Sequence, residues 1–290
     1  MLSIIIVGHN CADVITPCLR SLHAHPPTDA FEVIYVDNAS RDGSARLVAD
    51  TFPSVRVIPN TRNEGYQAAN NRGLDVARGD ILLLLNPDTV IRPGAIDTLA
   101  RFLRERPSVG AASPRCVFPD GRLQWTVAPF PSLAIIRHWF WQAHPALARL
   151  RGRSLVASGP AEVSTREQDY AYGACLAVKR DVIAVVGRLD ERYFLVGGEV
   201  AWSREIRRAG WQVFHVAEAE IEHHESVARK RRSWLSELDW VTAHRRLLYT
   251  YEGLRAGMVG DLLFSVHLVL FAGARLARPM RSGPRARDVR

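Results

Sequence analysis

Two short apolar runs that end abruptly in acid and amide side chains constrain this chain more than any other feature. They are Glu32–Asn38, with the sequence EVIYVDN, and Ile81–Asp88, with the sequence ILLLLNPD. Such runs are typical of buried parallel strands, and open α/β sheets bind ligands just beyond the carboxyl ends of these strands. Asp37 and Asp88 therefore predict one site, where two carboxylates could hold a nucleotide and a divalent metal.

The N-terminal part of the chain alternates predicted strands with predicted helices. This order implies an α/β fold with a mainly parallel sheet and right-handed crossovers. The predicted strands are Ser3–Val7, Glu32–Val36, Val55–Ile58 and Ile81–Leu85, and the predicted helices are Cys11–His23, Gly43–Thr51, Gln67–Ala77 and Gly94–Glu105.

The middle of the chain is less regular. Residues 119–121, Pro-Asp-Gly, form a turn signal that we expect to join two strands. Residues 122–168 are expected to form loops and short helices that cover the site. Regular structure resumes at Tyr170–Lys179, and is followed by predicted helices at Asp181–Val186 and Val200–Ala209 and a predicted strand at Gln212–Val216.

The C-terminal part has a different character. An apolar face at helical spacing predicts an amphipathic helix at Ser233–Tyr251. Met258–Ala277 is strongly apolar, but its uninterrupted core, Leu262–Ala274, is shorter than the roughly 20 residues that a membrane span needs. A buried helix and a helix lying in the membrane interface remain open alternatives, and the tail after Pro279 is expected to be disordered.

The excess positive charge is concentrated at the same end. The formal net charge is +8, with 25 basic and 25 acidic residues in 1–228 and 13 basic and 5 acidic in 229–290. This is either a solvated basic tail or a segment attracted to an anionic surface, a membrane or nucleic acid. We therefore expect one domain at 1–228 and a basic, apolar helical extension at 229–290, for which membrane association is one interpretation.

Cysteine usage and the N-terminus indicate the compartment. The four Cys residues form no CxxC pair, which argues against a zinc ribbon or a redox motif. Four scattered Cys fit a reducing cytoplasm better than a disulfide framework. The N-terminal apolar run lacks the basic start of a signal peptide, so a cytoplasmic protein, peripheral at the inner face of the membrane, is expected.

Five blocks resemble, in family order, the family 2 glycosyltransferases with the GT-A fold, and most of all their rhamnosyltransferase-like branch, which builds bacterial surface polysaccharides. The resemblance covers about residues 1–226 and implies a single Rossmann-like GT-A domain that transfers a sugar, with inversion, from a nucleoside diphosphate. The blocks are SIIIVGHN at 3–10, VIYVDNASRDGS at 33–44, NEGYQAANNRGLDVARGDILLLLNPD at 63–88, YGACLAVKRDVIAVVGRLDERYF at 172–194 and REIRRAGWQVFHVAEAEIEHHES at 204–226.

The resemblance implies a set of donor-binding residues. Asp37 matches the position that contacts the base, where a carboxylate can accept the ring N–H of a pyrimidine. A helix cap or a turn residue is the alternative role for Asp37. Gly65 would permit close approach of the backbone to the donor. The remaining donor-binding candidates are Asn10, Asn38, Asn63, Asn70 and Asn86.

A divalent metal, Mg²⁺ or Mn²⁺, is implied by the same likeness. Asp88 matches the last acid of the family's DxD-type motif, which here is Asn86–Pro87–Asp88, and one carboxylate beside substrate phosphates suits Mg²⁺. His223 is the better match for a second ligand, although His224 follows it directly. A simple turn at Asp88 and histidines without a ligand role are the alternatives.

The general base is the position at which this chain departs from the family. The family has a Glu-Asp pair and a later Asp, whereas this chain has Gly198, Glu199 and Ala201. Glu199 keeps a carboxylate at the base position and is our candidate catalytic residue, but general base catalysis needs good positioning. Asp190 and Glu191 are candidates on the acceptor side or for orienting the loop, and a surface turn is their alternative.

The sequence therefore predicts an inverting, metal-dependent transferase that adds a sugar, with rhamnose as one candidate, from a nucleoside-diphosphate sugar to a glycan or lipid-linked acceptor. The altered segment 198–201 supports one alternative, a catalytically impaired relative that binds nucleotide sugar as a scaffold or partner subunit. A nucleotidyltransferase would need a basic, Gly-rich loop where residues 8–14 read GHNCADV, and a Rossmann dehydrogenase would need GxGxxG, which does not occur. Nucleic-acid binding would depend only on the basic tail and is not expected.

Overall fold

The computed structural model describes residues 1–144, 163–225 and 234–276. The chain divides into two compact units. The first unit contains Met1–Phe130 and Ala157–His244, and the second contains Pro131–Val156 and Arg245–Arg290. The domain boundary expected at residue 228 stays a prediction. Residues 145–162 of the expected loops and short helices, and the tail after Pro279, lie outside the described residues.

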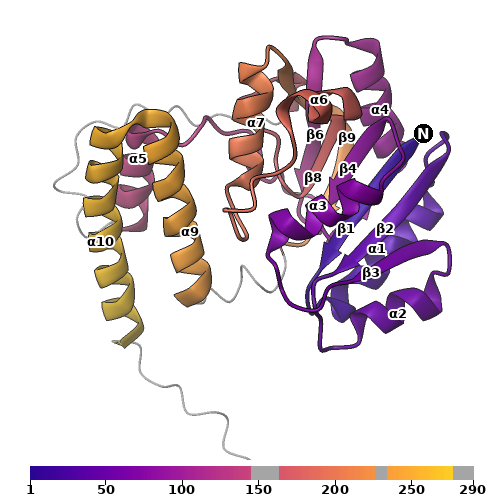
Figure 1. The fold of residues 1–290 in the computed structure, drawn as a ribbon, viewed down its shortest axis with the longest axis horizontal. Helices are drawn as coiled ribbons and strands as arrows, with labels where there is room; N and C mark the ends of the chain where they lie inside the picture. The colour runs from indigo at the N-terminus through magenta and orange to yellow at the C-terminus, as the bar shows by residue number, and fades with distance from the viewer. Residues whose placement is uncertain (145–162, 226–233, 277–290) are drawn as a thin grey trace, which may run out of the picture. The chain divides into compact units, whose positions relative to one another are not determined.

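A nine-stranded sheet forms the centre of the first unit (Figure 1). Its strand order is β3-β2-β1-β4-β8-β6-β9-β5, and β7 pairs with β9. The strands are β1 (Leu2–Gly8), β2 (Phe31–Asp37), β3 (Val55–Pro59), β4 (Ile81–Leu85), β5 (Thr89–Ile91), β6 (Val109–Val117), β7 (Arg166–Glu167), β8 (Cys175–Lys179) and β9 (Gln212–His223).

The predicted α/β fold is confirmed, and its first half is parallel. β1 runs parallel to β2 and β4, and β2 runs parallel to β3. The register pairs Gly8 with Asp37 and Ile6 with Leu85, so these strands end at one edge of the sheet. The second half is mixed, because β8 is antiparallel to both β4 and β6, whereas β9 is parallel to β6.

Helices cover both faces of this sheet, and each face has its own apolar core. The face formed by Ile4 and Ile6 packs against helices α1, α2 and α4, and the face formed by Ile5 and Ile34 packs against α3, α6 and α7. The helices are α1 (Ala12–Ala24), α2 (Ser44–Thr51), α3 (Tyr66–Val76), α4 (Ala95–Glu105), α6 (Arg180–Val186) and α7 (Gly198–Arg208). The predicted early strands and helices are therefore observed within a residue or two of their expected ends.

Several elements differ from the expectations. β5 and β7 were not predicted, and β6 was implied only as the strand before the turn at 119–121. The turn at 119–121 forms, with the amide of Gly121 donating to the Phe118 carbonyl at 2.8 Å, but it leads only to a single bridge between Val117 and Leu123. β9 continues to His223 instead of ending at Val216, and this extension carries a histidine to the carboxyl edge of β4.

The described part of the second unit is helical. It contains α5 (Leu133–Ala143), the π-helical turn η3 (Leu248–Glu252) and α10 (Leu254–Leu276). The amphipathic helix expected at Ser233–Tyr251 is observed as α9 (Trp234–Leu247), which continues into η3. Residues 234–244 of α9 belong to the first unit.

Candidate active site

Asp37 closes β2 and is buried at the carboxyl edge of the sheet. Its Oδ2 accepts a hydrogen bond from the backbone N–H of Ser40 at 3.0 Å, and its Oδ1 accepts one from the Tyr35 hydroxyl at 3.4 Å. These contacts fix the carboxylate at the start of the turn after β2. A carboxylate has about four acceptor sites, so the contacts leave capacity for a ligand N–H.

Asn38 is the hub of the adjoining loop. Its side-chain amide donates to Asn63 Oδ1 at 2.8 Å and to the Gly65 carbonyl at 3.1 Å. Its Oδ1 accepts from Asn60 Nδ2 at 3.1 Å and from the Glu64 amide at 3.0 Å. The side-chain amide of Asn38 is therefore hydrogen-bonded to other residues of the protein, and these bonds hold residues 60–65 beside the end of β2.

Gly65 is the residue immediately before α3, and its backbone adopts φ 86°, a conformation that favours glycine. A Cβ atom at this position would lie 2.6 Å from the carbonyl oxygen of Phe194, which is closer than any side chain can approach. Inside α3, Asn70 is fully buried and donates to the Tyr66 carbonyl at 2.9 Å. Gly65 thus allows the start of α3 to touch a loop more than a hundred residues later in the chain.

Asn10 and Asn86 lie at the ends of β1 and β4. Asn10 is exposed in the left-handed region, at φ 51°, where asparagine is enriched, and its Oδ1 accepts from the Arg41 amide at 2.8 Å. Asn86 is half-buried, and its backbone amide donates to the Ala174 carbonyl at 2.9 Å. Both residues therefore lie at the edge where Asp37 also ends its strand.

Asp88 and His223 face each other directly. His223 Nε2 lies 3.5 Å from Asp88 Oδ1, and both side chains are about 5% exposed. The pairing of β5 with β9, which sets Thr89 opposite His223, produces this contact. His224 instead points its Nε2 to Glu222 at 2.7 Å, so the structure separates the two histidines of the doublet.

This pair fits a divalent cation. Two atoms that each lie about 2.1 Å from one ion are separated by at most about 4.2 Å, and the observed 3.5 Å falls within that limit. No group of three or more His, Cys, Asp or Glu side chains suited to a metal occurs among the described residues. A cation held by Asp88 and His223 would therefore take its other ligands from substrate phosphates and water, as Mg²⁺ usually does.

Glu199 lies in the first turn of α7 and is half-buried. Burial raises the pKa of its carboxyl group above the usual range, and the negative charge of Asp239 raises it further, while backbone N–H groups at Gly197 and Glu199 oppose this shift. A Cβ atom on Gly173 would lie 3.6 Å from Glu199 Cγ, so Gly173 borders the Glu199 side chain. A raised pKa brings a carboxylate closer to the range that suits a general base at neutral pH.

The loop that precedes Glu199, residues 190–198, is tied down from two directions. On one side, the Tyr66 amide donates to the Phe194 carbonyl at 2.6 Å, and Gln67 Nε2 donates to the Leu195 carbonyl at 3.2 Å. On the other side, the carboxylate of Asp239 in α9 accepts from the amides of Leu195 and Val196 at 3.3 and 3.2 Å. The backbone before Glu199 is therefore held in one conformation.

Asp190 and Glu191 begin this loop, and both make contacts that orient it. Asp190 pairs with Arg192 at 2.7 Å. Glu191 accepts from Asn71 Nδ2 at 2.9 Å, and Asn71 also exchanges hydrogen bonds with the backbone of Leu189. These contacts fit the loop-orienting role considered from the sequence, and the roles of both residues stay predictions.

Tyr66 connects the two halves of the candidate site. Its hydroxyl donates to the Gly173 carbonyl at 3.2 Å. Burial raises its pKa, and the charges of Glu199 and Asp88 raise it further, which places both carboxylates within electrostatic reach of one phenol. Sequence reasoning missed Tyr66, and it also missed three residues whose partners lie far away in the chain: Gln67, Gln124 and Asp239.

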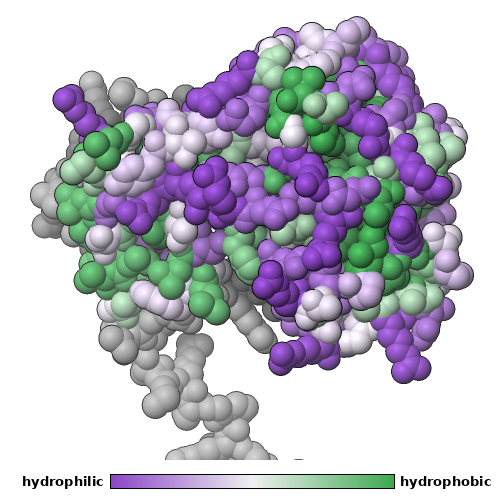
Figure 2. Space-filling model, in the orientation of Figure 1, coloured by the Kyte–Doolittle hydropathy of each residue, from purple (hydrophilic) through white to green (hydrophobic). Residues whose placement is uncertain are grey.

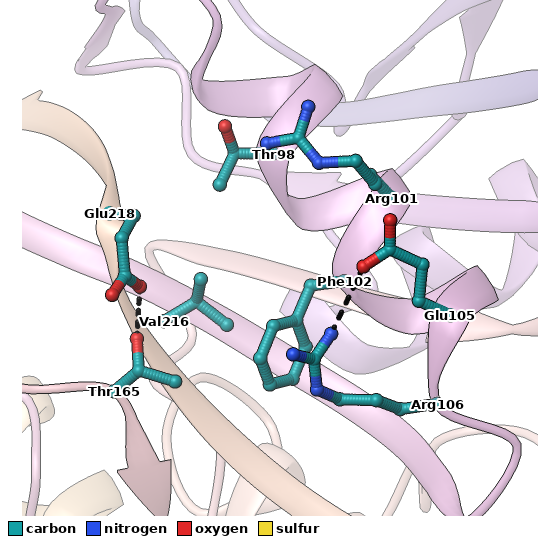
Figure 3. Close-up of a pocket in the computed structure, with 8 residues that line it drawn as sticks. All are labelled: Thr98, Arg101, Phe102, Glu105, Arg106, Thr165, Val216 and Glu218. Carbon is teal, nitrogen blue, oxygen red and sulfur yellow. Dashed lines mark hydrogen bonds and ion pairs between the residues drawn. The ribbon is translucent and has the colours of Figure 1, made fainter.

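Two pockets lie near the sheet. The pocket in Figure 3, of about 190 Å³, is lined by described residues that include none of the candidate site residues, and its charges pair locally, as in the 3.4 Å contact between Glu105 and Arg106. A larger hollow of about 590 Å³ is lined by polar side chains that include Asn63 and Glu191, together with Phe194. The larger hollow therefore adjoins the 190–198 loop.

Comparisons with known proteins identify a family and several relatives. The sequence model described as glycosyl transferase family 2 matches residues 3–158. The chain is 29% identical over 272 residues, 85% of both chains, to N-acetylglucosaminyl-diphospho-decaprenol L-rhamnosyltransferase of Mycobacterium tuberculosis. It is also 29% identical over 307 residues to the O-antigen biosynthesis protein RfbC of Myxococcus xanthus, of which it spans 23%.

Solved structures share the fold. A mannosyltransferase from Pyrobaculum calidifontis in complex with GDP-Man and Mn²⁺ matches 96% of this chain and 76% of its own, with a TM-score of 0.60 at 18% identity. GalNAc-T7 with UDP, GalNAc and Mn²⁺ matches 87% of this chain and 48% of its own, with a TM-score of 0.64 at 15% identity. At these identities the likeness establishes the architecture of the first unit's sheet and helices.

Proposed function

Because this chain belongs to glycosyl transferase family 2 and is a glycosyltransferase resembling the rhamnosyltransferases, we propose that it transfers a sugar, with inversion, from a nucleoside diphosphate to a surface glycan acceptor. The observation that carries this proposal is the buried pair of Asp88 and His223, 3.5 Å apart at the carboxyl edge of the sheet. Glu199 lies within electrostatic reach of the same tyrosine as Asp88.

The donor would bind along this edge. Asp37 would accept an N–H of the base, and Asn10, Asn63 and Asn86 would supply amides around the ribose and phosphates. Asn38, whose amide is occupied by the protein, would act by holding the loop. The named neighbours contain GDP-Man or UDP, which supports a nucleoside-diphosphate donor.

The residues present can perform an inverting displacement. The Glu199 carboxylate would take the proton of the acceptor hydroxyl as its oxygen forms a bond to the anomeric carbon. The bond from that carbon to the diphosphate oxygen breaks, and the nucleoside diphosphate leaves with the electron pair. Asp88 and His223 would hold a divalent metal, which would offset the charge on the departing diphosphate, and the two neighbours contain Mn²⁺.

The sugar and the acceptor follow from the relative that is matched along most of its length. That enzyme is named for rhamnosyl transfer to N-acetylglucosaminyl-diphospho-decaprenol. We accordingly propose rhamnose as the transferred sugar and a lipid-linked glycan as the acceptor, in the synthesis of cell-envelope polysaccharide.

A lipid-linked acceptor would bring the protein to the inner face of the membrane. Within α10, Leu254–Gly273 is long and apolar enough to span a membrane by length and composition, and 22% of this window is buried. Figure 2 shows hydrophobic residues over this helix. Its exposed side chains Leu254, Met258, Leu262, Val266 and Val269 repeat at helical spacing, and basic residues follow it. We propose that this face rests in an anionic membrane interface.

Calorimetric titration with UDP-, dTDP- and GDP-sugars, with and without Mn²⁺, tests the donor site without an acceptor. We expect metal-dependent binding of one donor that is lost in Asp88→Ala. Asp120→Ala is the matched control, because Asp120 is an exposed aspartate paired with Arg122 and should bind the donor normally. Failure of every donor to bind wild-type protein would contradict the proposed donor site and would favour a degenerate scaffold that shares only the ancestry of the family.

A further inference from the structure

Gln124 is a buried amide that contacts His223 at two points. It is 2% exposed. Its Nε2 lies 2.5 Å from the backbone carbonyl oxygen of His223, and its Oε1 lies 2.9 Å from His223 Nδ1. The contact joins residues that are 99 positions apart in the chain, so it is a tertiary contact between the segment after β6 and the end of β9.

These two contacts determine which ring nitrogen carries the proton. A backbone carbonyl can only accept, so the amide nitrogen of Gln124 must face the His223 carbonyl. The amide oxygen then faces Nδ1, and an oxygen acceptor requires that Nδ1 carries the hydrogen. In the neutral ring, Nε2 is left with its lone pair, and Nε2 is the atom that faces Asp88 at 3.5 Å.

The surroundings hold both partners in place. The Gln124 backbone amide donates to the Cys116 carbonyl in β6 at 2.9 Å, which anchors the residue just after the 119–121 turn. The ring of Tyr172 packs edge-on against His223, with ring centroids 6.0 Å apart. Two electron-pair donors, the Asp88 carboxylate and His223 Nε2, are thereby directed at the same small space.

We propose that Gln124 is a positioning residue that keeps His223 in its Nδ1-protonated tautomer, so that Nε2 and Asp88 together bind a divalent cation. This inference rests on the proposed function, because the cation is the one that would accompany the donor diphosphate. Hydrogen bonds to the second nitrogen of a ligand imidazole fix the tautomer and ring orientation, and their loss typically lowers metal affinity about 10- to 100-fold.

The first experiment measures the tautomer itself and needs no metal. Nitrogen-15 NMR of His223 in the full-length protein, at about pH 8, should show the hydrogen on Nδ1. Gln124→Leu should remove this preference. Gln168→Leu is the matched control, because Gln168 is also buried and its Nε2 donates to Ser113 and to the Phe214 carbonyl. A wild-type ring with its hydrogen on Nε2 would overturn the proposal.

The second experiment measures Mn²⁺ binding by electron paramagnetic resonance, with Mn²⁺ alone and with UDP, dTDP or GDP. Gln124→Leu should weaken Mn²⁺ binding about 10- to 100-fold, whereas Gln168→Leu should leave it unchanged. Gln124→Glu keeps an acceptor for Nδ1–H but loses the donation to the His223 carbonyl, so it should restore part of the affinity, which provides a test if the leucine variant folds poorly.

The outcomes separate the two proposals. Equal Mn²⁺ affinity in wild-type protein and in both Gln124 variants would overturn the positioning role and leave the proposed function intact. Failure of wild-type protein to bind Mn²⁺ with any of the three nucleotides, despite an Nδ1-protonated His223, would contradict the metal dependence of the proposed function and the cation role of this pair.

Discussion

Replacing Asn38 by alanine would test whether this residue holds the donor-side loop or contacts the donor directly. The four hydrogen bonds of its side chain join the end of β2 to Asn60, Asn63, Glu64 and Gly65, and the side chain is 2% exposed. Alanine would remove all four bonds and leave several of their partners in a buried loop. The structure therefore predicts a loss of stability before any loss of ligand contact.

The size of the effect follows from the number of bonds. A net contribution of about 1 kcal/mol for each intramolecular hydrogen bond gives a loss of about 4 kcal/mol in the free energy of unfolding. That is a large fraction of the roughly 5–15 kcal/mol that stabilises an ordinary domain. A shift of about 2–4 °C for each kcal/mol in a chain of this size corresponds to a fall in Tm of about 10 °C. Asn38→Asp keeps an acceptor oxygen but sets a buried carboxylate oxygen against Asn63 Oδ1 and the Gly65 carbonyl, so it should destabilise the protein at least as much as alanine.

Thermal unfolding and donor calorimetry on the same samples check this prediction. Asn86→Ala is a suitable control, because Asn86 is half-buried at the same edge and should change the free energy of unfolding by no more than about 1 kcal/mol. The reasoning is refuted if Asn38→Ala keeps the wild-type Tm but loses donor affinity. That result would mean that the Asn38 amide is available to the donor.

Four further predictions concern the base and the C-terminal helix. Glu199→Gln should lower transfer by about 10²- to 10⁴-fold with donor binding intact, and unimpaired transfer would remove Glu199 from the role of base. Burial raises the pKa of Glu199, so the folded protein holds the proton of this carboxyl group more tightly than the unfolded chain does. The free energy of unfolding should therefore fall as pH rises from the ordinary glutamate pKa of 4.5 through the raised pKa of the folded state. Glu199→Gln should reduce this pH dependence in unfolding measurements. Asp239→Asn removes a charge that raises the pKa of Glu199, so the acidic limb of the kcat/KM profile should move to lower pH, and an unmoved limb would show that Asp239 does not act on the base. Deleting the residues after Tyr251 should reduce sedimentation with anionic liposomes, whereas unchanged sedimentation would argue that α10 packs against protein.

The sequence was most informative where one strand carries one unbroken apolar run. β1, β2 and β4 are such strands, and the acids and amides that end them mark the ligand edge. β6 carries no such signal, because its sequence VGAASPRCV is rich in small residues and includes a proline, which is uncommon inside a sheet. It forms a strand because β8 and β9 pair with its two sides, with a register shift between Pro114 and Arg115.

The sequence after Val216 contains an alternating pattern that could have predicted the extension of β9 to His223. After Val216, the buried residues Ala217, Ala219, Ile221 and His223 alternate with more exposed acidic residues. This is the period of a strand with one buried face. The alternation distinguishes His223 from His224, because His223 falls on the buried side. By contrast, nothing in the local sequence connects Gln124 with His223, since the contact depends on tertiary packing.

At position 198 this chain has glycine in place of the glutamate of the family's Glu-Asp pair, and the packing around Gly198 explains this difference. A Cβ atom at Gly198 would lie 2.2 Å from the side-chain amide carbon of Gln67, so Gln67 fills the space that a side chain at 198 would need. Gln67 also donates to the Leu195 carbonyl and helps to hold the backbone that leads to Glu199. The glycine therefore accompanies a buried glutamine that braces the loop from α3, while Asp239 braces it from α9. These contacts hold the backbone that leads to Glu199, and such order is what a general base would need; the role of Glu199 as base stays a prediction.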